Sequence, residues 1–421
     1  MQAVILAAGE SSRFWPLSDK RHKALSKVAG TPLLEWTLSS VKKAGIKDII
    51  IVEGPDKAAE KGMDLKNNSG MRIQFVVQEK PLGMGNAIMQ AEKYIKGDFF
   101  VLNPNHYDTD FYIAPMIEKQ RATKAQVVLV GKKTETPEKY GMLSLEGDKA
   151  VNLVEKPKKG SEPSDVRIVG IYLLSKNFFE YYARAKEHMY AYEDALRFCM
   201  KDADVRVVMT AKKTSTMKYP WDLFNMAKDV IEKNIRSKCI AASAKIAKSA
   251  LIEGAVNIGE NVRVLENAVI KGPCYIGNNT LIGNNAIVRD FCSIGTDCII
   301  GANAEVARSI IGDGTHTHSG FIGDSIIGDN CRIGAGFMTA NVRIDRKNVK
   351  SVVKGEKVDT GLKSLGVIIG HNTNIGIGVQ AMPGILVGSG CIVGPGSLIL
   401  ENIEGNTKYY SKFKSVVKKR E

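Results

Sequence analysis

A branched aliphatic residue occupies every sixth position from Ile252 to Val306, and a small or β-branched residue stands four positions after each. A helix repeats every 3.6 residues and a strand every 2, so a period of six fits neither alone. It predicts short strands joined by turns and wound into a coil, with one large and one small side chain per repeat pointing inward. The large positions are Ile252, Ile258, Val264, Ile270, Ile276, Ile282, Val288, Ile294, Ile300 and Val306, and the small ones are Val256, Val262, Ala268, Cys274, Thr280, Ala286, Cys292, Cys298 and Ala304.

Before this repeat, apolar segments of strand and helix type alternate. We expect strands at 2–7, 48–52, 73–77 and 98–102, and helices at 33–41 and 85–94. Such alternation predicts a doubly wound, Rossmann-like α/β sheet of mostly parallel strands, with the loop Gly9–Arg13 at the strand ends where ligands bind. An apolar stripe in 222–238 predicts a helix that covers the sheet and connects the domains.

These patterns predict the domain organisation. We expect an α/β domain at residues 1–235, a linker at 236–250, a coiled-strand domain at 251–405 and a basic tail at 406–421. The six-residue register breaks at Arg308, resumes at Phe321, and is lost again between Ile333 and Ile369. We expect loops to leave the coil at 307–320 and 340–364, often on the binding face of such a solenoid.

Composition narrows the class of protein. The chain has 421 residues, of which 44% are hydrophobic, so it can form a sizeable core. It has seven cysteines, an odd number, and none forms a CxxC pair. Cys274, Cys292 and Cys298 stand in the small inward positions, and Cys331 and Cys391 repeat that phase. We interpret them as small hydrophobic residues rather than disulfide or metal sites.

The formal charge of +14 could suggest nucleic acid, but no recognition motif accompanies it, and phosphorylated substrates explain a basic balance as well. No basic segment precedes the first apolar run, and no apolar run approaches the about 18–20 residues that span a bilayer. We expect a cytoplasmic protein without nucleic-acid or membrane partners.

The segment Leu6–Leu17, reading LAAGESSRFWPL, is followed by Lys23 and resembles the sugar-1-phosphate nucleotidylyltransferases. Further matches follow in order at Gln78-Glu79, Gly83-Met84-Gly85, Tyr140-Gly141, Glu155-Lys156-Pro157 and Pro220-Trp221-Asp222-Leu223. The resemblance implies that Gly9, Arg13 and Lys23 bind the nucleotide phosphates. It also implies that Gln78 and Gly83 recognise the base, and that Gly141, Glu155 and Lys156 line the sugar site.

The resemblance to the nucleotidylyltransferases does not extend to the two magnesium-binding positions. Asn105 and Thr216 stand where the family has its two magnesium-binding Asp residues, and neutral oxygens are poor replacements for carboxylates. Asp108 or Asp110 could substitute, so the part played by Mg²⁺ stays open. Our hypothesis is that this domain has weak or no nucleotidyl transfer activity while still binding UTP or a UDP-sugar. Smaller departures from the family pattern are Ser11 for Gly, His22 for Pro and Ile168 for Asn.

The repeat region resembles the left-handed parallel β-helix of hexapeptide acyltransferases. Its loop residues resemble the acetyltransferase half of the bifunctional glucosamine-1-phosphate acetyltransferase/uridylyltransferases, closest to archaeal enzymes. The resemblance implies that His318 is the catalytic base and that acetyl-CoA is the co-substrate. An exposed loop histidine is the alternative for His318, and His316 has no matching role. Asn341, Lys347 and Lys350 match acetyl-site residues, although a solvated basic loop would also explain the two lysines.

The same resemblance implies a sugar-phosphate site with Arg289, which matches a phosphate-binding Arg. Ala307 replaces an expected Lys, next to Arg308, and Phe321 replaces a Tyr. Phe337 replaces a usual Thr. The resemblance also implies a homotrimer, with coenzyme A bound between subunits near 370–396. The basic tail could cap the coil or touch the coenzyme.

Three functions compete. The leading prediction is N-acetylation of glucosamine-1-phosphate, or a related amino-sugar-1-phosphate, in UDP-N-acetylglucosamine biosynthesis. The first alternative is a fully bifunctional enzyme that also makes the UDP-sugar from UTP. The second is a non-catalytic regulatory subunit of a sugar nucleotidylyltransferase, against which the set of acetyl-site residues argues.

Overall fold

The computed structural model describes residues 1–19, 21–63, 69–212, 214, 216–414 and 417. The chain divides into two compact units. The first comprises Met1–Glu10 and Pro32–Thr216, and the second comprises Ser11–Thr31 and Met217–Glu421. Segment 11–31 thus belongs with the repeat region, although its sequence motif places it with the α/β domain.

The first unit is built on a nine-stranded sheet in the order β5-β4-β1-β6-β10-β7-β11-β9-β8. Strands β5, β4, β1 and β6 are parallel, as the alternating pattern predicts. Strand β10 then runs antiparallel to both β6 and β7, and only the β11–β7 pair of the remaining strands is parallel. The strands are β1 (Gln2–Ala7), β4 (Asp48–Glu53), β5 (Arg72–Val77), β6 (Phe99–Leu102), β7 (Val127–Lys133), β8 (Gly141–Glu146), β9 (Lys149–Glu155), β10 (Val166–Leu174) and β11 (Val205–Met209).

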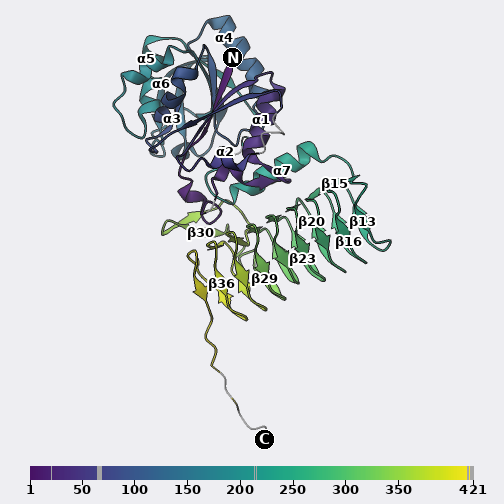
Figure 1. Ribbon diagram of the computed structural model, residues 1–421. Coiled ribbons are helices and arrows are strands. Elements are labelled where there is room, and N and C mark those ends of the chain that lie inside the picture. The colour runs from purple at the N-terminus through teal and green to yellow at the C-terminus, as the bar shows by residue number, and fades with distance from the viewer. Residues whose placement is uncertain (20, 64–68, 213, 215, 415–416, 418–421) are drawn as a thin grey trace. The chain divides into compact units, whose positions relative to one another are not determined.

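Helices cover both faces of this sheet (Figure 1). Successive residues of a strand point to opposite faces of the sheet. On one face, Val4, Ile50 and Val101 pack in a buried cluster with residues of α3, α5 and α6. The helices of the unit are α1 (Leu33–Lys43), α2 (Ala58–Gly62), α3 (Met84–Ala91), α4 (Asp110–Thr123), α5 (Phe178–Ala183) and α6 (Ala191–Asp202). The strands and helices expected between residues 2 and 102 are confirmed to within a few residues. None of the helices in the described residues is long and apolar enough to cross a membrane.

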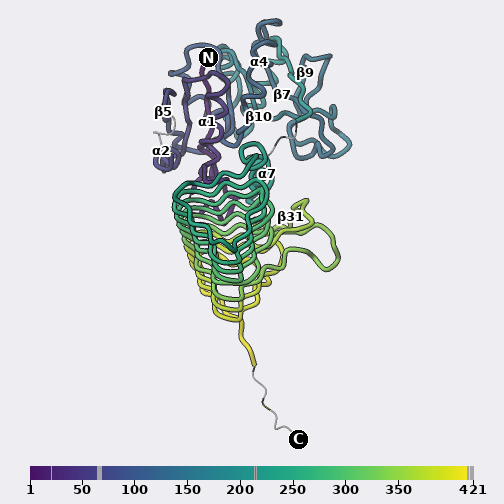
Figure 2. The backbone as a smooth tube through the Cα atoms, turned by 90° about the vertical axis from the view of Figure 1, so that its right-hand side faces the viewer, coloured from purple at the N-terminus to yellow at the C-terminus, as the bar shows by residue number. Residues whose placement is uncertain are grey.

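The second unit is dominated by a coil whose strands form three parallel sheets (Figures 1 and 2). The first sheet contains β12 (Cys239–Ile240), β15 (Val256–Ile258), β18 (Cys274–Ile276), β21 (Ser293–Ile294), β24 (Ile310–Ile311), β27 (Ile326–Ile327), β32 (Val367–Ile369) and β35 (Ile385–Val387). The second contains β13 (Lys245–Ile246), β16 (Arg263–Val264), β19 (Leu281–Ile282), β22 (Ile299–Ile300), β25 (His316–Thr317), β28 (Arg332–Ile333), β33 (Asn374–Ile375), β36 (Ile392–Val393) and β38 (Lys408–Tyr409). The third contains β14 (Leu251–Glu253), β17 (Val269–Lys271), β20 (Ile287–Arg289), β23 (Ala304–Ala307), β26 (Gly320–Gly323), β29 (Phe337–Thr339), β34 (Gln380–Ala381) and β37 (Leu398–Ile399).

The inward positions predicted from the period of six form the core of this coil. Every one of them from Val256 to Val306 is buried, and only Ile252, at the open end, is partly exposed. The five cysteines in the small positions are also fully buried, and burial raises the pKa of the Cys298 and Cys331 thiols to about 12. Their interpretation as small hydrophobic residues is confirmed.

The coil begins earlier than the sequence pattern predicts. Strands β12 and β13 lie in the expected linker and pair with β15 and β16 of the coil. Helix α7 (Asp222–Asn234) also belongs to the second unit, where Lys228 Nζ lies 5.1 Å from the centre of the Phe291 ring. Its buried stripe packs there, and the expectation that this helix covers the α/β sheet is wrong.

The prediction of a first loop at 307–320 is also wrong, because the coil continues through these residues as β24, β25 and β26. Ile294 pairs with Ile311 rather than with residue 312, and Val306 pairs with Ile322 rather than with residue 324, so one residue is missing near Arg308 and another between Thr317 and Ile322. The inward residue of the core is Ile322, so the expectation that the register resumes at Phe321 is wrong by one position. In the sequence, a shortened corner changes the six-residue register in the same way as an inserted loop, so the two cannot be distinguished by the repeat alone. Phe337 lies in the same region at a small inward position and is fully buried, in register with Gly320, which has no side chain.

The second expected loop is confirmed. Residues between β29 and β32 leave the coil and form the hairpin of β30 (Lys350–Val353) and β31 (Glu356–Asp359) (Figure 2). At the other end, β38 pairs with β36 and Tyr409 packs on the core, so this part of the tail caps the coil. Residues 415–416 and 418–421 of the predicted tail lie outside the described residues.

Candidate active sites

The residues of the predicted phosphate loop differ in their surroundings. A Cβ atom on Gly9 would meet no atom within 4 Å, and Ser11 adopts a left-handed conformation with φ 57°, which explains the family's preference for Gly. Arg13 is exposed. The ammonium of Lys23 donates to the Met217 carbonyl oxygen at 3.2 Å. Burial and the charge of Arg13 lower the pKa of Lys23.

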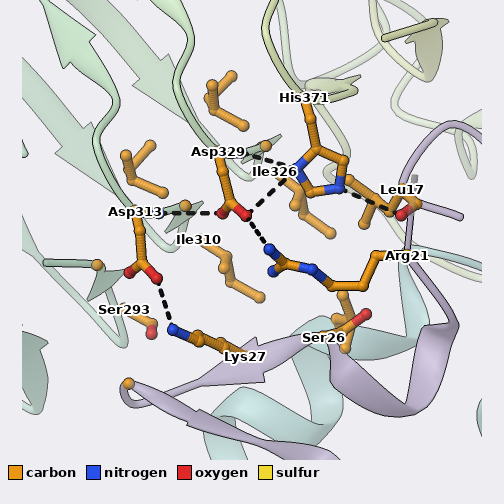
Figure 3. Close-up of a pocket in the computed structure, with 17 residues that line it drawn as sticks. Leu17, Arg21, Ser26, Lys27, Ser293, Ile310, Asp313, Ile326, Asp329 and His371 are labelled. Atoms are coloured by element: carbon orange, nitrogen blue, oxygen red, sulfur yellow. Dashed lines mark hydrogen bonds and ion pairs between the residues drawn. The ribbon is translucent and has the colours of Figure 1, made fainter. Parts of the chain in front are cut away.

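Segment 11–31 lies on one corner of the coil (Figure 3). Arg21 pairs with Asp329 at 2.8 Å, and Lys27 pairs with Asp313 at 2.6 Å. His371 lies between coil and segment, with Nδ1 accepting from the Asp329 N–H at 2.9 Å and Nε2 lying 3.3 Å from the Leu17 carbonyl oxygen. These residues line a cavity of about 50 Å³. Figure 3 shows Asp329 between His371 and Arg21.

The same corner carries a ladder of hydrogen bonds. A polar side chain on each of several coils accepts from the backbone N–H of the preceding coil. The acceptors in order are Asp313, Asp329, His371 and Ser389. The N–H of Ser389 donates in turn to Asp19 of segment 11–31 at 3.1 Å, so the segment completes the ladder.

In the first unit, the predicted base-recognition residues lie together. The Gln78 amide is buried and donates to the Gly83 carbonyl oxygen at 3.2 Å and to Asn86 at 2.9 Å. Gly83 has φ +97°, and a Cβ atom there would lie 2.7 Å from the Met189 carbonyl oxygen. Only glycine fits this position, where α3 begins.

The predicted sugar-site residues also lie together, around a pocket of about 250 Å³ that Gly141, Glu155 and Thr216 help to line. A Cβ atom on Gly141 would lie 2.8 Å from a Glu155 carboxylate oxygen, and Lys156 pairs with Glu155 at 3.1 Å. Arg167 lines the same pocket and is only 7% exposed. Its guanidinium lies 4.2 Å from the centre of the Tyr140 ring and donates to the Thr214 hydroxyl. Burial lowers the pKa of Arg167.

Asn105 is buried in a turn after β6, next to His106, which is 6% exposed. His106 Nε2 has no hydrogen-bond partner among the described residues and lies beside Gly170. Burial lowers the pKa of His106 to about 4, so the ring is neutral at physiological pH. The two candidate replacement carboxylates have partners. Asp108 pairs with Lys212 at 3.1 Å, and Asp110 accepts from the Ser40 hydroxyl at 2.6 Å.

This donor set does not fit a carboxylate magnesium site. Asn105 and Thr216 offer neutral oxygens, and the carboxylate of Asp108 is already engaged by an ammonium. Within the described part of the chain, no group of three or more His, Cys, Asp or Glu side chains is arranged to hold a metal ion.

His318 opens onto a groove of about 540 Å³ along the second sheet of the coil. It is exposed, at the corner after β25, and shares the groove with Arg332, Asn374 and Tyr410. His316, expected in a loop, is a strand residue in register with Arg332. Burial and the charge of Arg332 lower the pKa of His316.

The other predicted acetyl-site residues form a second group on the third sheet. Arg308 pairs with Asp324 at 2.7 Å, and Asn341 donates to the same carboxylate at 2.6 Å. Arg289 pairs with Glu305 and Asp290, so carboxylates already neutralise both guanidinium groups. Phe321 and Asn341 both lie against Gly323, where a Cβ atom would meet the Phe321 ring at 2.4 Å and the Asn341 amide at 3.1 Å.

Lys347 and Lys350 lie in the excursion between β29 and β32, and both are exposed. The Lys347 N–H donates to Asp345 at 3.2 Å, and the Lys350 backbone packs on Gly384. The structure therefore does not bring the four predicted catalytic residues together in a single chain. Asn341 lies with Arg308, whereas His318 lies in the groove.

Sequence reasoning missed the corner network of Arg21, Asp329 and His371, and the groove residues Arg332 and Asn374. A signal was available for the network, since Asp313, Asp329 and His371 each stand two residues after a large inward aliphatic. Histidine is unusual in that column. For Arg167 and His106 the sequence offers no comparable signal.

Two family comparisons cover the two parts of the chain. The Nucleotidyl transferase family matches residues 2–223, and the Bacterial transferase hexapeptide family matches residues 273–308. Among solved structures, UDP-glucose pyrophosphorylase from Acinetobacter baumanii aligns with a TM-score of 0.50 and 20% identity, over 55% of this chain and 94% of that one. At that identity the likeness shows the fold alone.

Full-length relatives carry both parts. The chain is 39% identical to the Bifunctional protein GlmU of Methanococcus maripaludis, over 100% of both proteins. It is 29% identical to the Bifunctional sugar-1-phosphate nucleotidylyltransferase/acetyltransferase of Sulfurisphaera tokodaii, over 96% of this chain and 98% of that protein. The fold is therefore a nucleotidyltransferase domain with a left-handed parallel β-helix of hexapeptide repeats, and the chain belongs to the GlmU family of bifunctional transferases.

Proposed function

We propose that this protein transfers the acetyl group of acetyl-CoA to the amino group of glucosamine-1-phosphate, or a related amino-sugar-1-phosphate. The observation that carries the proposal is the placement of His318, exposed at the mouth of a groove in a hexapeptide coil. The end-to-end similarity to proteins named as bifunctional GlmU supports it. We also propose that nucleotidyl transfer by the first unit is weak or lost.

His318 supplies the base for acetyl transfer. The substrate amine is an ammonium near neutral pH and cannot attack a thioester until it loses a proton, which an imidazole can accept. The free amine then forms the new C–N bond as the thioester C–S bond breaks, and the proton that the nitrogen loses as the amide forms goes to the sulfur, which leaves as the thiol of coenzyme A. Asn341 would hold the amine or acetyl group, and Arg289, Arg308, Lys347 and Lys350 would bind phosphates.

A complete acetyl site on this design needs a second copy of the chain. His318 precedes β26 and the Arg308–Asp324 pair lies at the far end of that strand, whose four residues span about 13 Å. The groove around His318 includes neither Arg289 nor Arg308. Packing of another coil against the groove would bring the missing phosphate-binding residues, which supports the predicted homotrimer.

For the first unit, the neutral donors at Asn105 and Thr216 support loss of the metal and therefore of efficient transfer from UTP. The base-recognition residues Gln78 and Gly83, which lie together, support retained binding of UTP or a UDP-sugar. The names of the full-length relatives favour the fully bifunctional alternative. The cytoplasmic location stays a prediction.

Product analysis by mass tests the proposal. The purified protein is incubated with glucosamine-1-phosphate, acetyl-CoA, UTP and magnesium. We expect N-acetylglucosamine-1-phosphate to accumulate with little UDP-sugar. Rapid formation of UDP-N-acetylglucosamine would establish the bifunctional alternative, and no acetylated product would remove the acetyltransferase assignment for this substrate and favour a regulatory subunit.

A further inference from the structure

The β-helix holds the segment that carries the predicted phosphate-binding residues. Apart from a contact of Ser389 Oγ with the Pro16 carbonyl oxygen at 3.5 Å, five contacts join the described residues of segment 11–31 to successive coils within the second unit. From one end to the other they are Ala29 N–H to Ser293 Oγ at 2.9 Å, Lys27 to Asp313 at 2.6 Å, Arg21 to Asp329 at 2.8 Å, Leu17 O to His371 Nε2 at 3.3 Å, and Asp19 to Ser389 N–H at 3.1 Å. Because the contacts are spread over several coils, they hold the backbone of the segment at several points along its length.

Asp329 is the central group of this attachment. Its residue is 9% exposed, and its carboxylate accepts from the Asp313 N–H at 3.1 Å while pairing with Arg21. His371 Nδ1 lies 3.5 Å from Asp329 Oδ2, the oxygen that pairs with Arg21, whereas Oδ1 accepts from the Asp313 N–H. Burial alone would raise the pKa of Asp329, but the charge of Arg21 and the hydrogen bond from the Asp313 N–H hold it below its usual value. The carboxylate is therefore charged and forms its ion pair with Arg21 of segment 11–31.

Segment 11–31 also carries Arg13 and Lys23, the two cations that are expected to bind the nucleotide phosphates. Arg13 and Lys23 stand on either side of Leu17 and Asp19, and these two residues contact the coil at His371 and Ser389. Any shift of this stretch on the coil would move both cations. An oxyanion site depends on such groups being held in place before the ligand arrives.

We propose that Asp329, with His371, is a positioning residue for nucleotide binding, so that the β-helix sets the affinity of the phosphate loop for a nucleoside triphosphate. This inference rests on the proposed role of Arg13 and Lys23 in binding the nucleotide. It assigns to the acetyltransferase-type domain a structural part in the other activity of the chain. Neither Asp329 nor His371 is among the residues expected to bind the nucleotide.

The test uses the full chain and Mg-UTP as the probe, with the dissociation constant measured by calorimetry. Asp329→Asn keeps an oxygen for the Asp313 N–H and removes the charge that faces Arg21, so the coil ladder survives. We expect the dissociation constant to rise about tenfold, and Arg21→Gln to give the same rise. The double variant should bind no worse than either single variant, because the two changes break one contact.

Hydrogen exchange supplies the second readout. Amides of residues 11–31 should exchange faster in Asp329→Asn, while those of β28 and β33 should not change. Asp297→Asn is the matched control, since Asp297 is a corner aspartate that accepts from Asn279 at 3.0 Å within the coil. We expect parent-like binding and exchange from it.

Three outcomes would overturn the inference. If the parent binds Mg-UTP and Asp329→Asn binds it equally well, Asp329 does not position the loop, and the proposed nucleotide site stands. If exchange rises throughout the coil, the residue acts on stability only. If the parent does not bind Mg-UTP, both this inference and the nucleotide-binding part of the proposed function fail.

Discussion

In the first unit, buried polar groups lie in the pocket (Arg167) and beside its lining residue Gly170 (His106), whereas the groove of the β-helix holds exposed polar groups. Arg167 and His106 are 7% and 6% exposed, and Arg167 already has a hydroxyl and an aromatic ring as partners. His318 and Arg332 face solvent along the coil. Buried groups are costly to leave unsatisfied, so the first site tolerates few changes of charge or ligand. The groove carries no such cost and is open to substrate or to a second chain.

The largest effect should come from the exposed site. General bases contribute about 10²–10⁴-fold, and we expect His318→Ala to lower kcat for acetyl transfer by about 10³-fold. The measurement is release of coenzyme A thiol at saturating substrates. His316→Ala, two residues earlier in β25, is the matched control, and it should change kcat only a few-fold because His316 has no expected role in proton transfer. A rate for His318→Ala near that of the parent would remove this histidine from the mechanism.

The next effect should come from the buried site and should appear as pH-dependent stability. The pKa of His106 is about 4 in the folded chain, against an ordinary value of 6.5, so the unfolded chain takes up a proton first as the pH falls. Stability due to neutral His106 is therefore complete above about pH 6.5 and declines below it. The loss should reach about 2 kcal/mol at pH 5.

Thermal unfolding of the full chain at pH 7 and pH 5 measures this loss. His106→Asn removes the titrating ring, and the difference between the two pH values should shrink for the transition of the first unit. His188→Asn is the control, because His188 is an exposed histidine of the same unit, paired with Asp194. An equal pH dependence in the parent and in His106→Asn would show that this ring is not buried as a neutral group.

The sequence predicted the scaffold of both regions but not all of their sites. The period of six located the inward residues from Val256 to Val306, because the interior of a narrow coil admits only certain sizes. It misplaced a loop at 307–320, since a residue missing at each of two corners shifts the phase just as an insertion does.

For the site residues, the sequence predicted contacts between residues that are close along the chain better than contacts between distant ones. Gln78 with Gly83, and Glu155 with Lys156, are close along the chain and were expected together. The contact of Arg21 with Asp329 depends on how the coils stack, and that of His371 with Asp329 spans an excursion whose length no pattern limits. The burial of Arg167 likewise depends on the assembled sheet rather than on its neighbours in sequence.

The smallest effect, and the sharpest contrast between the two regions, should come from restoring charge to the first site. We expect Asn105→Asp together with Thr216→Asp to raise UDP-sugar formation from UTP at least about tenfold, because two carboxylates are what Mg²⁺ requires. The assay is release of pyrophosphate at several magnesium concentrations, and the gain should depend on magnesium. Thr216→Asp alone is the control, since one carboxylate leaves the Asn105 side neutral. No gain in the double variant would mean that the buried surroundings of Asn105, with His106 beside it and Asp108 held by Lys212, no longer admit a metal, so that the site has diverged further than two substitutions.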